Sequence, residues 1–258
     1  MLSQQRQNKI LDLLAEHRFY GLNKLAEELN VSISTARRDL DELERMGSVR
    51  RTHGGVMLLG DRNRLPAFND RQAVMAAEKS AIGMLAASLV EEGDTIIIDG
   101  GTTPYQVAMH LQHKRLQVIT NSLPVANLFA DLTNVQVIGT GGSLYPGTGV
   151  YLGLYAENML KNVRAQKAFI GVAGISEEGF YNSNALLVET EKRMIEAAGE
   201  VYVVADHTKF SRRDLAYFCD FSRISAIITG EAAGETKQLQ KEIAKKTRLI
   251  HTALPRPK

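Results

Sequence analysis

The stretch VSISTARRDLDELERMGSVRRTHGG, residues 31–55, decides how the N-terminal part of this chain folds. Ser32 is a good N-cap, so we expect a helix to begin directly after it. Gly47 is expected to end that helix, because glycine readily adopts the left-handed conformation found just beyond helix C-termini. At about 100° per residue, the apolar side chains that share one stripe, and should face a core, are Ile33, Ala36, Leu40 and Leu43.

Two further helices are expected before this stretch. An apolar helical face runs from about residue 3 to residue 17, and Gly21 interrupts it. Residues 22–30, LNKLAEELN, then predict a second short helix, which is followed by a tight turn at Asn30 and Val31. Two short helices joined by so short a turn indicate a helix-turn-helix.

The outward face of the third helix has the chemistry of a DNA-reading helix. On a helical wheel Arg38 lies opposite the apolar stripe, and Arg37 and Asp39 lie on its flanks. Hydroxyl groups contact phosphates and base edges, and arginine can bind guanine through two hydrogen bonds. The alternative is an ordinary solvated helix face. The other well-exposed residues of this helix are Ser34, Thr35, Glu42 and Arg45.

The residues after this helix favour the DNA-binding alternative. SVRRTHGGVML, residues 48–58, predicts a strand, a glycine turn and a returning strand, which together resemble the wing of a winged helix. Basic side chains in such a wing can meet the phosphate backbone, although His53 could equally be a loop histidine without a contact. The acids Asp39, Asp41, Glu42 and Glu44 must lie away from DNA or pair with arginines. The residues expected to contact DNA are Ser32, Ser34, Thr35, Arg37, Arg38, Arg50, Arg51 and His53.

Residues 6–40 resemble the N-terminal signature of the DeoR family of transcriptional regulators. RRTHGG, residues 50–55, also resembles the wing of that family. The residues that carry the resemblance at the family's spacing are Arg6, Ile10, Leu14, Ser32, Thr35, Ala36, Arg37, Arg38, Asp39 and Leu40.

Composition limits the class of protein and the compartment to which the whole chain can belong. Its 258 residues, 44% hydrophobic and 23% charged, suit a soluble globular protein of about two domains. Cys219 is the only cysteine, so no intramolecular disulfide can form, which fits a reducing compartment. The amphipathic, acid-containing start is unlike a secretory signal, and no apolar run reaches the ~20 residues of a membrane helix. We therefore expect a cytoplasmic protein without membrane contact.

Net charge does not decide whether the chain binds nucleic acid. The whole chain carries +2, and residues 1–57 hold nine Lys and Arg against eight Asp and Glu, a net of +1. The DNA-binding interpretation therefore depends on where the charges lie. The expected organisation is a winged helix-turn-helix over residues 1–57, a polar linker over residues 58–71 and an α/β domain over residues 72–258.

The α/β domain is expected from residue 72 onward, where amphipathic helices alternate with short apolar strands. This alternation predicts a mostly parallel sheet covered by helices on both faces. Ligands of such sheets bind beyond the carboxyl ends of the strands. The expected strands are TIIID, LQVIT, VQVIG, KAFIG, VYVVA and AIITG.

The loop after the first of these strands, DGGTTPYQVA, predicts an anion site. Asp99 begins it, and Gly100 and Gly101 allow the backbone to approach a ligand closely. Thr102 or Thr103 is expected to cap the next helix, with a proline in its first position. Free N–H groups at a helix start favour phosphate. The alternative is a plain glycine turn.

Polar or glycine-bearing loops follow three more strands, and this recurrence favours one shared site. Asn121 and Ser122 follow LQVIT, and a glycine-rich loop that contains Gly141 and Gly142 follows VQVIG. After VYVVA comes ADHTKF, residues 205–210. We expect these loops to bind a small polyol-like anion together.

These loops resemble the C-terminal sensor domain of the DeoR family, a fold shared with ribose-phosphate isomerases and coenzyme A transferases. The resemblance implies a phosphorylated sugar or related metabolite as effector. DGGTT departs from the family's Asp-Ser-Gly-Thr-Thr at Gly100, and His207 replaces a serine in ADHTKF. In ETEKRMI, Glu189 and Lys192 either line the site or form an exposed pair. The expected effector-binding residues are Asp99, Gly100, Gly101, Thr102, Thr103, Asn121, Ser122, Gly141, Gly142, Glu189, Asp206 and Lys209.

Three functions remain open on the sequence. The favoured one is a ligand-responsive transcription factor without enzymatic activity, a repressor of a carbohydrate or polyol catabolic operon. It would bind double-stranded operator DNA and a phosphorylated effector as a homodimer or homotetramer, without a metal or cofactor. The second is a sugar-phosphate isomerase with Asp99, Glu189 or Asp206 as base and Lys209 steadying an enediolate. The third is an architectural DNA-binding protein, which leaves the glycine loops unexplained.

Overall fold

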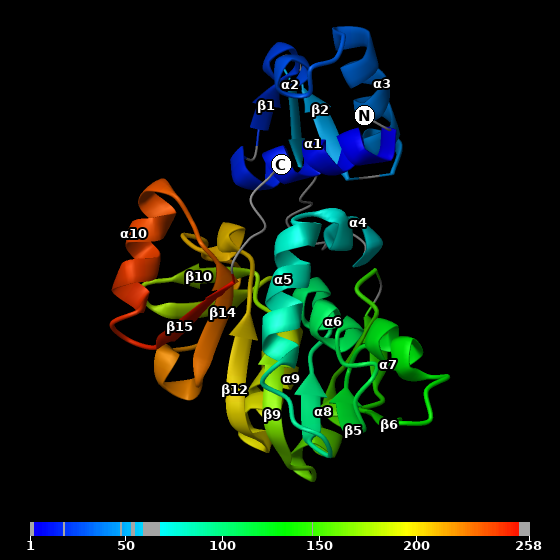
Figure 1. Ribbon diagram of the computed structural model, residues 1–258, viewed down its shortest axis with the longest axis vertical. Helices are drawn as coiled ribbons and strands as arrows, with labels where there is room; N and C mark the ends of the chain where they lie inside the picture. Colours follow the sequence, from blue (N-terminus) through cyan, green and yellow to red (C-terminus); the bar gives the residue numbers. More distant parts are fainter. Residues whose placement is uncertain are drawn as a thin grey trace. The chain divides into compact units, whose positions relative to one another are not determined.

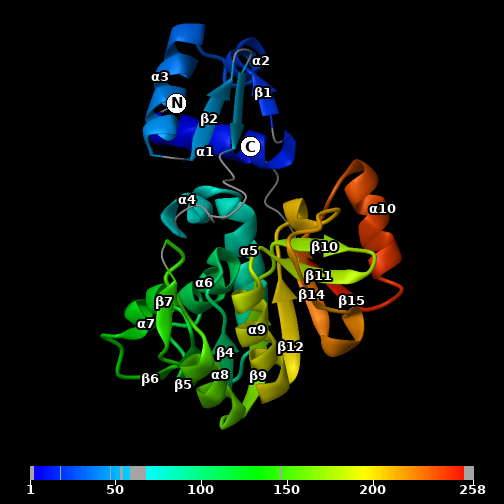
Figure 2. The ribbon, with the colours of Figure 1, turned by 180° about the vertical axis from the view of Figure 1, so that it is seen from behind.

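The computed structural model describes residues 3–17, 19–46, 48–52, 55–58, 68–145 and 147–252. It divides into two units, Met1–Ala76 and Ala77–Lys258 (Figures 1 and 2). Each unit has a hydrophobic core of its own. In the described residues no helix combines the length and apolar character needed to cross a bilayer.

The first unit is a winged helix-turn-helix, as the sequence predicts. Its three short strands form an antiparallel sheet in the order β1-β3-β2, and β2 and β3 are the two strands of the wing. Asn30 adopts a left-handed φ of 50° in the turn between the second and third helices. The elements are α1 (Ser3–His17), β1 (Phe19–Gly21), α2 (Leu22–Glu28), α3 (Ile33–Arg45), β2 (Val49–Thr52), β3 (Gly55–Leu58) and α4 (Phe68–Ala73).

The buried stripe of α3 differs from the expected one at two positions. Ile33 was expected in the core but is 44% exposed in the first turn of the helix. Asp39 was expected on a flank but is only 3% exposed. The stripe thus begins one turn later, and it includes an acid because Arg6 on α1 neutralises that acid.

The contact between Arg6 and Asp39 joins α1 to α3. Arg6 Nε donates to Asp39 Oδ2 at 2.7 Å, and Arg6 Nη2 donates to Oδ1 at 3.1 Å. The Ser3 hydroxyl also donates to Oδ1 at 2.9 Å. A two-point arginine–carboxylate contact fixes direction as well as distance, so it holds α3 at a defined angle on α1.

The region expected to be a linker begins in a strand and ends in a helix. Leu58 closes β3, Phe68–Ala73 forms α4, and residues 59–67 lie outside the described residues. Ala73 and Val74 pack against the core of the first unit. The boundary between the units follows residue 76 rather than residue 71.

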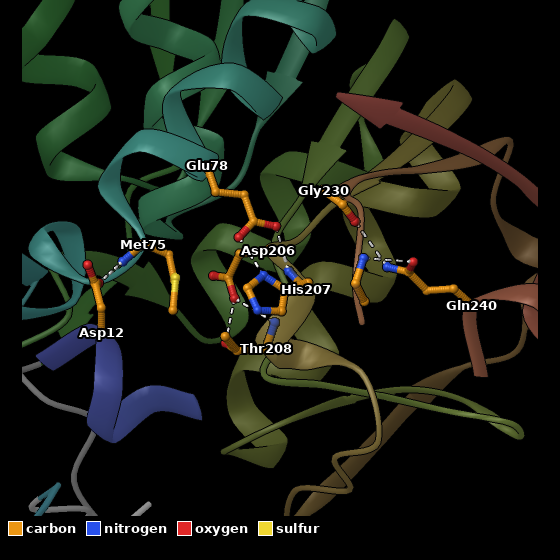
Figure 3. Close-up of polar contacts among 9 residues, drawn as sticks. Asp12, Met75, Glu78, Asp206, His207, Thr208, Gly230 and Gln240 are labelled. Atoms are coloured by element: carbon orange, nitrogen blue, oxygen red, sulfur yellow. Dashed lines mark hydrogen bonds and ion pairs between the residues drawn. The ribbon is translucent and has the colours of Figure 1, made fainter. Parts of the chain in front are cut away.

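Met75, next to the last residue of the first unit, has an unusual backbone conformation. Met75 has a left-handed φ of 53°, and its N–H donates to Asp12 Oδ1 of α1 at 2.7 Å (Figure 3). A left-handed conformation is uncommon for a residue other than glycine. The hydrogen bond to α1 holds the chain in this conformation directly before α5 begins.

The second unit is built on a seven-stranded parallel sheet in the order β15-β14-β12-β9-β4-β5-β6. Its elements up to β9 are α5 (Ala76–Ala87), β4 (Thr95–Ile98), α6 (Thr102–Met109), β5 (Leu116–Thr120), α7 (Leu123–Phe129), β6 (Val135–Gly139), β7 (Ser143–Tyr145), β8 (Val150–Leu152), α8 (Leu154–Lys161) and β9 (Ala165–Ile170). The remaining elements are β10 (Gly174–Ser176), β11 (Gly179–Asn182), α9 (Ala185–Ala197), β12 (Ala198–Val204), η1 (His207–Lys209), β13 (Ala216–Cys219), η2 (Phe221–Arg223), β14 (Ala226–Gly230), α10 (Gly234–Ile243) and β15 (Arg248–Thr252).

Helices cover both faces of this sheet. Alternate strand residues point to opposite faces, so Ile96 and Ile98 of β4 pack with α5, α6 and α7, whereas Ile97 packs with α8, α9 and α10. The α5 side faces the viewer in Figure 1 and the α9 side in Figure 2. The predicted parallel α/β domain is confirmed.

Two groups of short antiparallel strands have no counterpart in the sequence prediction. The glycine-rich segment after β6 was expected to be a flexible loop, but it contains the β7–β8 hairpin. Strands β10, β11 and β13 form a separate three-stranded sheet. These strands have only three or four residues each, too few to show a reliable alternation of apolar and polar residues.

Candidate DNA-contacting helix and effector site

The start of α3 is organised by the hydroxyl groups that the sequence assigns to DNA contact. Ser32 Oγ accepts a hydrogen bond from the Thr35 N–H at 3.2 Å, which confirms Ser32 as the N-cap. Its hydroxyl also lies 2.9 Å from the Ser34 and Thr35 hydroxyls. These three groups form one network, so a phosphate or base edge would meet them as a set.

Arg37 and Arg38 are exposed on α3, and neither makes an ion pair with another described residue. Ser32, Ser34 and Arg38 thus lie at the surface of the N-terminal half of the helix. Exposed guanidinium groups beside hydroxyls are what a major-groove reading helix presents. Contact of these side chains with DNA remains a prediction.

Three of the four acids on this helix pair with arginine side chains, one of the two alternatives expected. Asp39 binds Arg6, and Glu42 binds Arg45. Asp41 binds the Arg51 side chain, and Glu44 Oε1 accepts from the Arg51 N–H at 2.9 Å. Arg51 therefore connects the wing to α3. Three expected features lie outside what the structure describes, namely Gly47, the side chain of Arg50, and His53.

The turn after β4 occupies the point where the strand order reverses. From β4 the chain proceeds to β5 and β6 on one side, whereas β9, β12, β14 and β15 lie on the other. Asp99 spans this point: its N–H donates to Phe169 O, and its Oδ2 accepts from the Gly171 N–H, both at 3.1 Å. Ligands of open α/β sheets bind at such a switch point.

The helix after this turn begins differently from the expectation. Gly101 is the N-cap of α6, with φ −78° and ψ 161°, and no side chain caps the helix. Thr102 and Thr103 are its first two residues, so neither hydroxyl acts as the predicted cap, and Pro104 stands third rather than first. The N–H groups at this helix start have no carbonyl partner within the helix.

The structure leaves no space for a side chain at Gly100. A Cβ on Gly100 would lie 1.8 Å from Val150 Cγ1 of the β7–β8 hairpin and 3.5 Å from Asn121 Oδ1. The serine expected from the family resemblance therefore cannot fit while Val150 occupies this place. A Cβ on Gly101 would lie 2.9 Å from Pro104 Cδ.

Gly100→Ser is expected to destabilise the second unit by roughly 1–3 kcal/mol, the usual cost of overpacking. Urea unfolding of the variant and the wild type measures the difference. The double variant Gly100→Ser with Val150→Ala removes the clashing methyl groups and should recover most of that loss. A single variant as stable as the wild type would contradict the close contact.

Asn121 and Ser122, the two residues predicted after β5, have different roles. Ser122 Oγ accepts from the Val125 N–H at 3.3 Å and so caps α7. Asn121 is 1% exposed, and both its amide nitrogen and its amide oxygen lack a hydrogen-bond partner. Buried amides are nearly always paired, so Asn121 is a candidate ligand-binding side chain.

The two glycines after β6 shape the entry to the hairpin. Gly141 and Gly142 have φ values of 64° and 113°, which favour glycine. A Cβ on Gly142 would lie 2.7 Å from the Leu152 carbonyl oxygen. Gly142 thus lets the chain pass close to β8, whose Val150 lies against Gly100.

The acidic helix α9 brings a different glutamate to the site from the one expected. Glu189 is half exposed and pairs with Lys192 at 2.9 Å, the second of the two alternatives. Glu191 is 2% exposed; Asn182 Nδ2 donates to its Oε1 at 2.5 Å, while its Oε2 has no partner. Burial, and then the charge of Asp99, raise the pKa of Glu191 well above its usual value.

Helical spacing could have identified Glu191 from the sequence. It lies three and four residues from apolar positions on both sides, so it shares a face with them, whereas Glu189 does not. The buried apolar residues that define this face are Leu187, Val188, Met194 and Ile195.

A second polar cluster follows β12. Asp206 is buried and caps the short helix η1 by accepting from the Thr208 N–H at 3.1 Å (Figure 3). Burial alone would raise the pKa of Asp206, but the charges of Lys209 and Lys79 and the Thr208 hydrogen bond lower it overall. The predicted pair Asp206 and Lys209 is thus accompanied by a buried lysine from α5.

No pattern in the sequence indicates that α5 binds this loop. Glu78 Oε1 accepts from the His207 N–H at 2.8 Å, and Glu78 Oε2 lies 2.7 Å from His207 Nδ1 (Figure 3). Gly230, the last residue of β14, makes room for this carboxylate, because a Cβ there would lie 2.2 Å from Glu78 Oε1. Glu78 therefore anchors the first turn of α5 to η1.

The structure thus sorts the predicted effector residues into two clusters. One surrounds the turn after β4 and contains Asp99, Gly100, Gly101 and Asn121, to which the structure adds the unpredicted Glu191. The other follows β12, whose strand lies two spacings, about 10 Å, from β4. Among the described residues no group of three or more histidines, cysteines, aspartates and glutamates is placed to bind a metal ion.

Comparison with known proteins matches both units. Residues 6–61 match the DeoR-like helix-turn-helix domain, and residues 74–231 match the DeoR C terminal sensor domain. The HTH-type transcriptional repressor GlcR of Bacillus subtilis (strain 168) is 33% identical over 229 residues, 89% of each chain.

Two other relatives have similar identity. The lactose phosphotransferase system repressor of Lactococcus lactis subsp. lactis is 34% identical over 89% of this chain and 91% of its own. The glycerol-3-phosphate regulon repressor of Escherichia coli (strain K12) is 32% identical over the same shares. Among solved structures, ribose 5-phosphate isomerase A of Methanocaldococcus jannaschii is 17% identical over 51% of this chain and 53% of its own, with a TM-score of 0.38.

Proposed function

Because this chain belongs to the DeoR family of DNA-binding transcriptional regulators, we propose that it represses a carbohydrate or polyol catabolic operon and releases its operator when a phosphorylated metabolite binds. The relatives named above are themselves repressors, two of them of a lactose system and a glycerol-3-phosphate regulon. Because this family consists of transcriptional regulators, we reject the alternative that the chain is a sugar-phosphate isomerase. We place the protein in the cytoplasm, together with its operator.

The DNA-binding part of the proposal is supported by α3. Arg37 and Arg38 are exposed there beside the hydroxyl network of Ser32, and Asp41 and Glu42 pair with arginine side chains. These pairs reduce the repulsion between the helix and the negative DNA surface. Operators with two-fold symmetry require two such helices, so we propose a dimer or a tetramer.

The effector part is carried by one observation: Asn121 is buried with both amide atoms unpartnered, against the Gly100 turn at the switch point of the sheet. A bound ligand would satisfy those atoms. The N–H groups at the start of α6 suit a phosphate. Binding there would lower operator affinity through a coupling free energy, typically ~1–3 kcal/mol.

The test is fluorescence anisotropy of the purified chain on the intergenic DNA beside its own gene, at fixed salt. Sugar and polyol phosphates are titrated into the complex, with inorganic phosphate as a control. We expect tight binding that one compound releases, with operator affinity reduced by roughly 5–150-fold. Binding that no compound alters would contradict the effector part, and binding no tighter than to unrelated DNA would contradict the operator part.

A further inference from the structure

We infer that Asn121 and Glu191 form the hydroxyl-binding part of the effector site, and that the effector therefore presents alcohol groups to the Asp99–Gly100 turn. This inference rests on the proposed function, since it assigns a chemical role within the proposed site. Glu191 was not among the residues expected from the sequence, and it replaces Glu189 in this role.

Asn121 and Glu191 both carry buried polar atoms that lack a hydrogen-bond partner. Seven buried side-chain nitrogen and oxygen atoms lack a hydrogen bond, and three of them belong to Asn121 and Glu191. Both side chains are at least 98% buried. Because an unpaired buried polar group is costly, these three atoms indicate a place where a polar ligand binds.

The two side chains come from segments that are far apart in the sequence. Asn121 follows β5, and its Oδ1 lies 3.5 Å from the place that a Cβ on Gly100 would take. Glu191 comes from α9, and it lies close enough to Asp99 for the charge of that residue to raise its pKa. Asn182 holds Glu191 Oε1, so Oε2 is the atom left for a ligand.

The hydrogen-bonding chemistry of these atoms favours hydroxyl groups of the effector as their partners. An asparagine amide offers both a donor and an acceptor, and a carboxyl group accepts a hydrogen bond and, when protonated, also donates one. An alcohol hydroxyl both donates and accepts, so it complements this set. A phosphate offers mainly acceptors and carries negative charge, which Asp99 would repel. The alcohol groups are therefore expected beside Asn121 and Glu191, and the phosphate at the N–H groups that begin α6.

Calorimetric titration of the full chain tests the assignment. The first probe is the sugar or polyol phosphate that releases the wild type from DNA, and the second is inorganic phosphate. The variants are Asn121→Leu, which keeps the branched shape without polar atoms, Glu191→Ala and Glu191→Gln. Glu189→Gln, on the same helix but in the exposed pair with Lys192, is the matched control. Melting curves verify that each variant is folded.

We expect Asn121→Leu and Glu191→Ala to weaken binding of the sugar phosphate by roughly tenfold or more, because a site built to bind hydroxyls loses its partner atoms. Inorganic phosphate should bind them as it binds the wild type. Glu191→Gln keeps a donor at the same place and should retain most of the affinity, and Glu189→Gln should be unchanged.

Two results would overturn the inference. One is wild-type affinity for the sugar phosphate in folded Asn121→Leu and Glu191→Ala. The other is an equal loss of sugar phosphate and inorganic phosphate, which would assign these residues to the phosphate. If Glu191→Ala does not fold, Asn121→Leu decides between the same outcomes. Failure of every compound to release wild-type protein from DNA would instead contradict the proposed function, before any variant is compared.

Discussion

Arg38→Ala is expected to weaken binding to the operator by roughly 10–100-fold, the range for losing one good bidentate contact to a base. Arg38 is exposed on α3, opposite the buried stripe and beside Arg37. No described acid pairs with it, so its guanidinium group is available to a base edge. Fluorescence anisotropy at fixed salt on the operator and on unrelated DNA measures the effect.

Arg45→Ala is the matched control for this prediction. Arg45 lies at the C-terminal end of the same helix and pairs with Glu42. Recognition helices read bases with their N-terminal residues, so the control should retain nearly all of its specific affinity. Equal operator binding by Arg38→Ala and the wild type would show that this face of α3 does not read DNA.

Gly101→Val is expected to abolish the effect of the effector on DNA affinity, a change of roughly 5–150-fold in the wild type. Its Cβ would lie 2.9 Å from Pro104 Cδ and 3.6 Å from Gly171 Cα, so the start of α6 must shift. The larger side chain would also obstruct the N–H groups proposed to bind the phosphate. DNA binding without effector should be unchanged, because Gly101 lies in the other unit.

Gly139→Val provides the comparison for a glycine at another strand end. Gly139 closes β6, and a Cβ there would have no atom within 4 Å. Its substitution should leave both operator binding and release intact. Normal release of DNA by Gly101→Val, with the same compound and at the same concentration, would refute the assignment of this turn to the effector.

The sequence predicts the two-unit fold well, because both units follow strong local patterns. The Ser32 cap, the turn at Asn30 and the stripe through Leu40 specify the helix-turn-helix. The β-strands of the second unit are nearly continuous apolar runs. The β7–β8 hairpin escapes prediction because three-residue strands depend on tertiary contacts, such as Val150 against Gly100.

The site is predicted less completely, for a physical reason. Residues next to each other in a loop, such as Asp99 to Gly101, can be read together from the sequence. A contact between distant segments, such as Glu78 with His207, cannot. Asp39 shows the same limit: its charge suggests a surface position until Arg6, 33 residues away, is seen to pair with it.

Two hydrogen-bonded anchors lie close to the boundary between the two units, one on each side of it. Met75 is tied to Asp12 in the first unit, and Glu78 is tied to His207 in the second. Only two residues stand between these anchors, and α5 begins at the first of them, so they are helical rather than extended. The covalent path from the Asp12 contact to the His207 contact therefore runs through less than one helical turn.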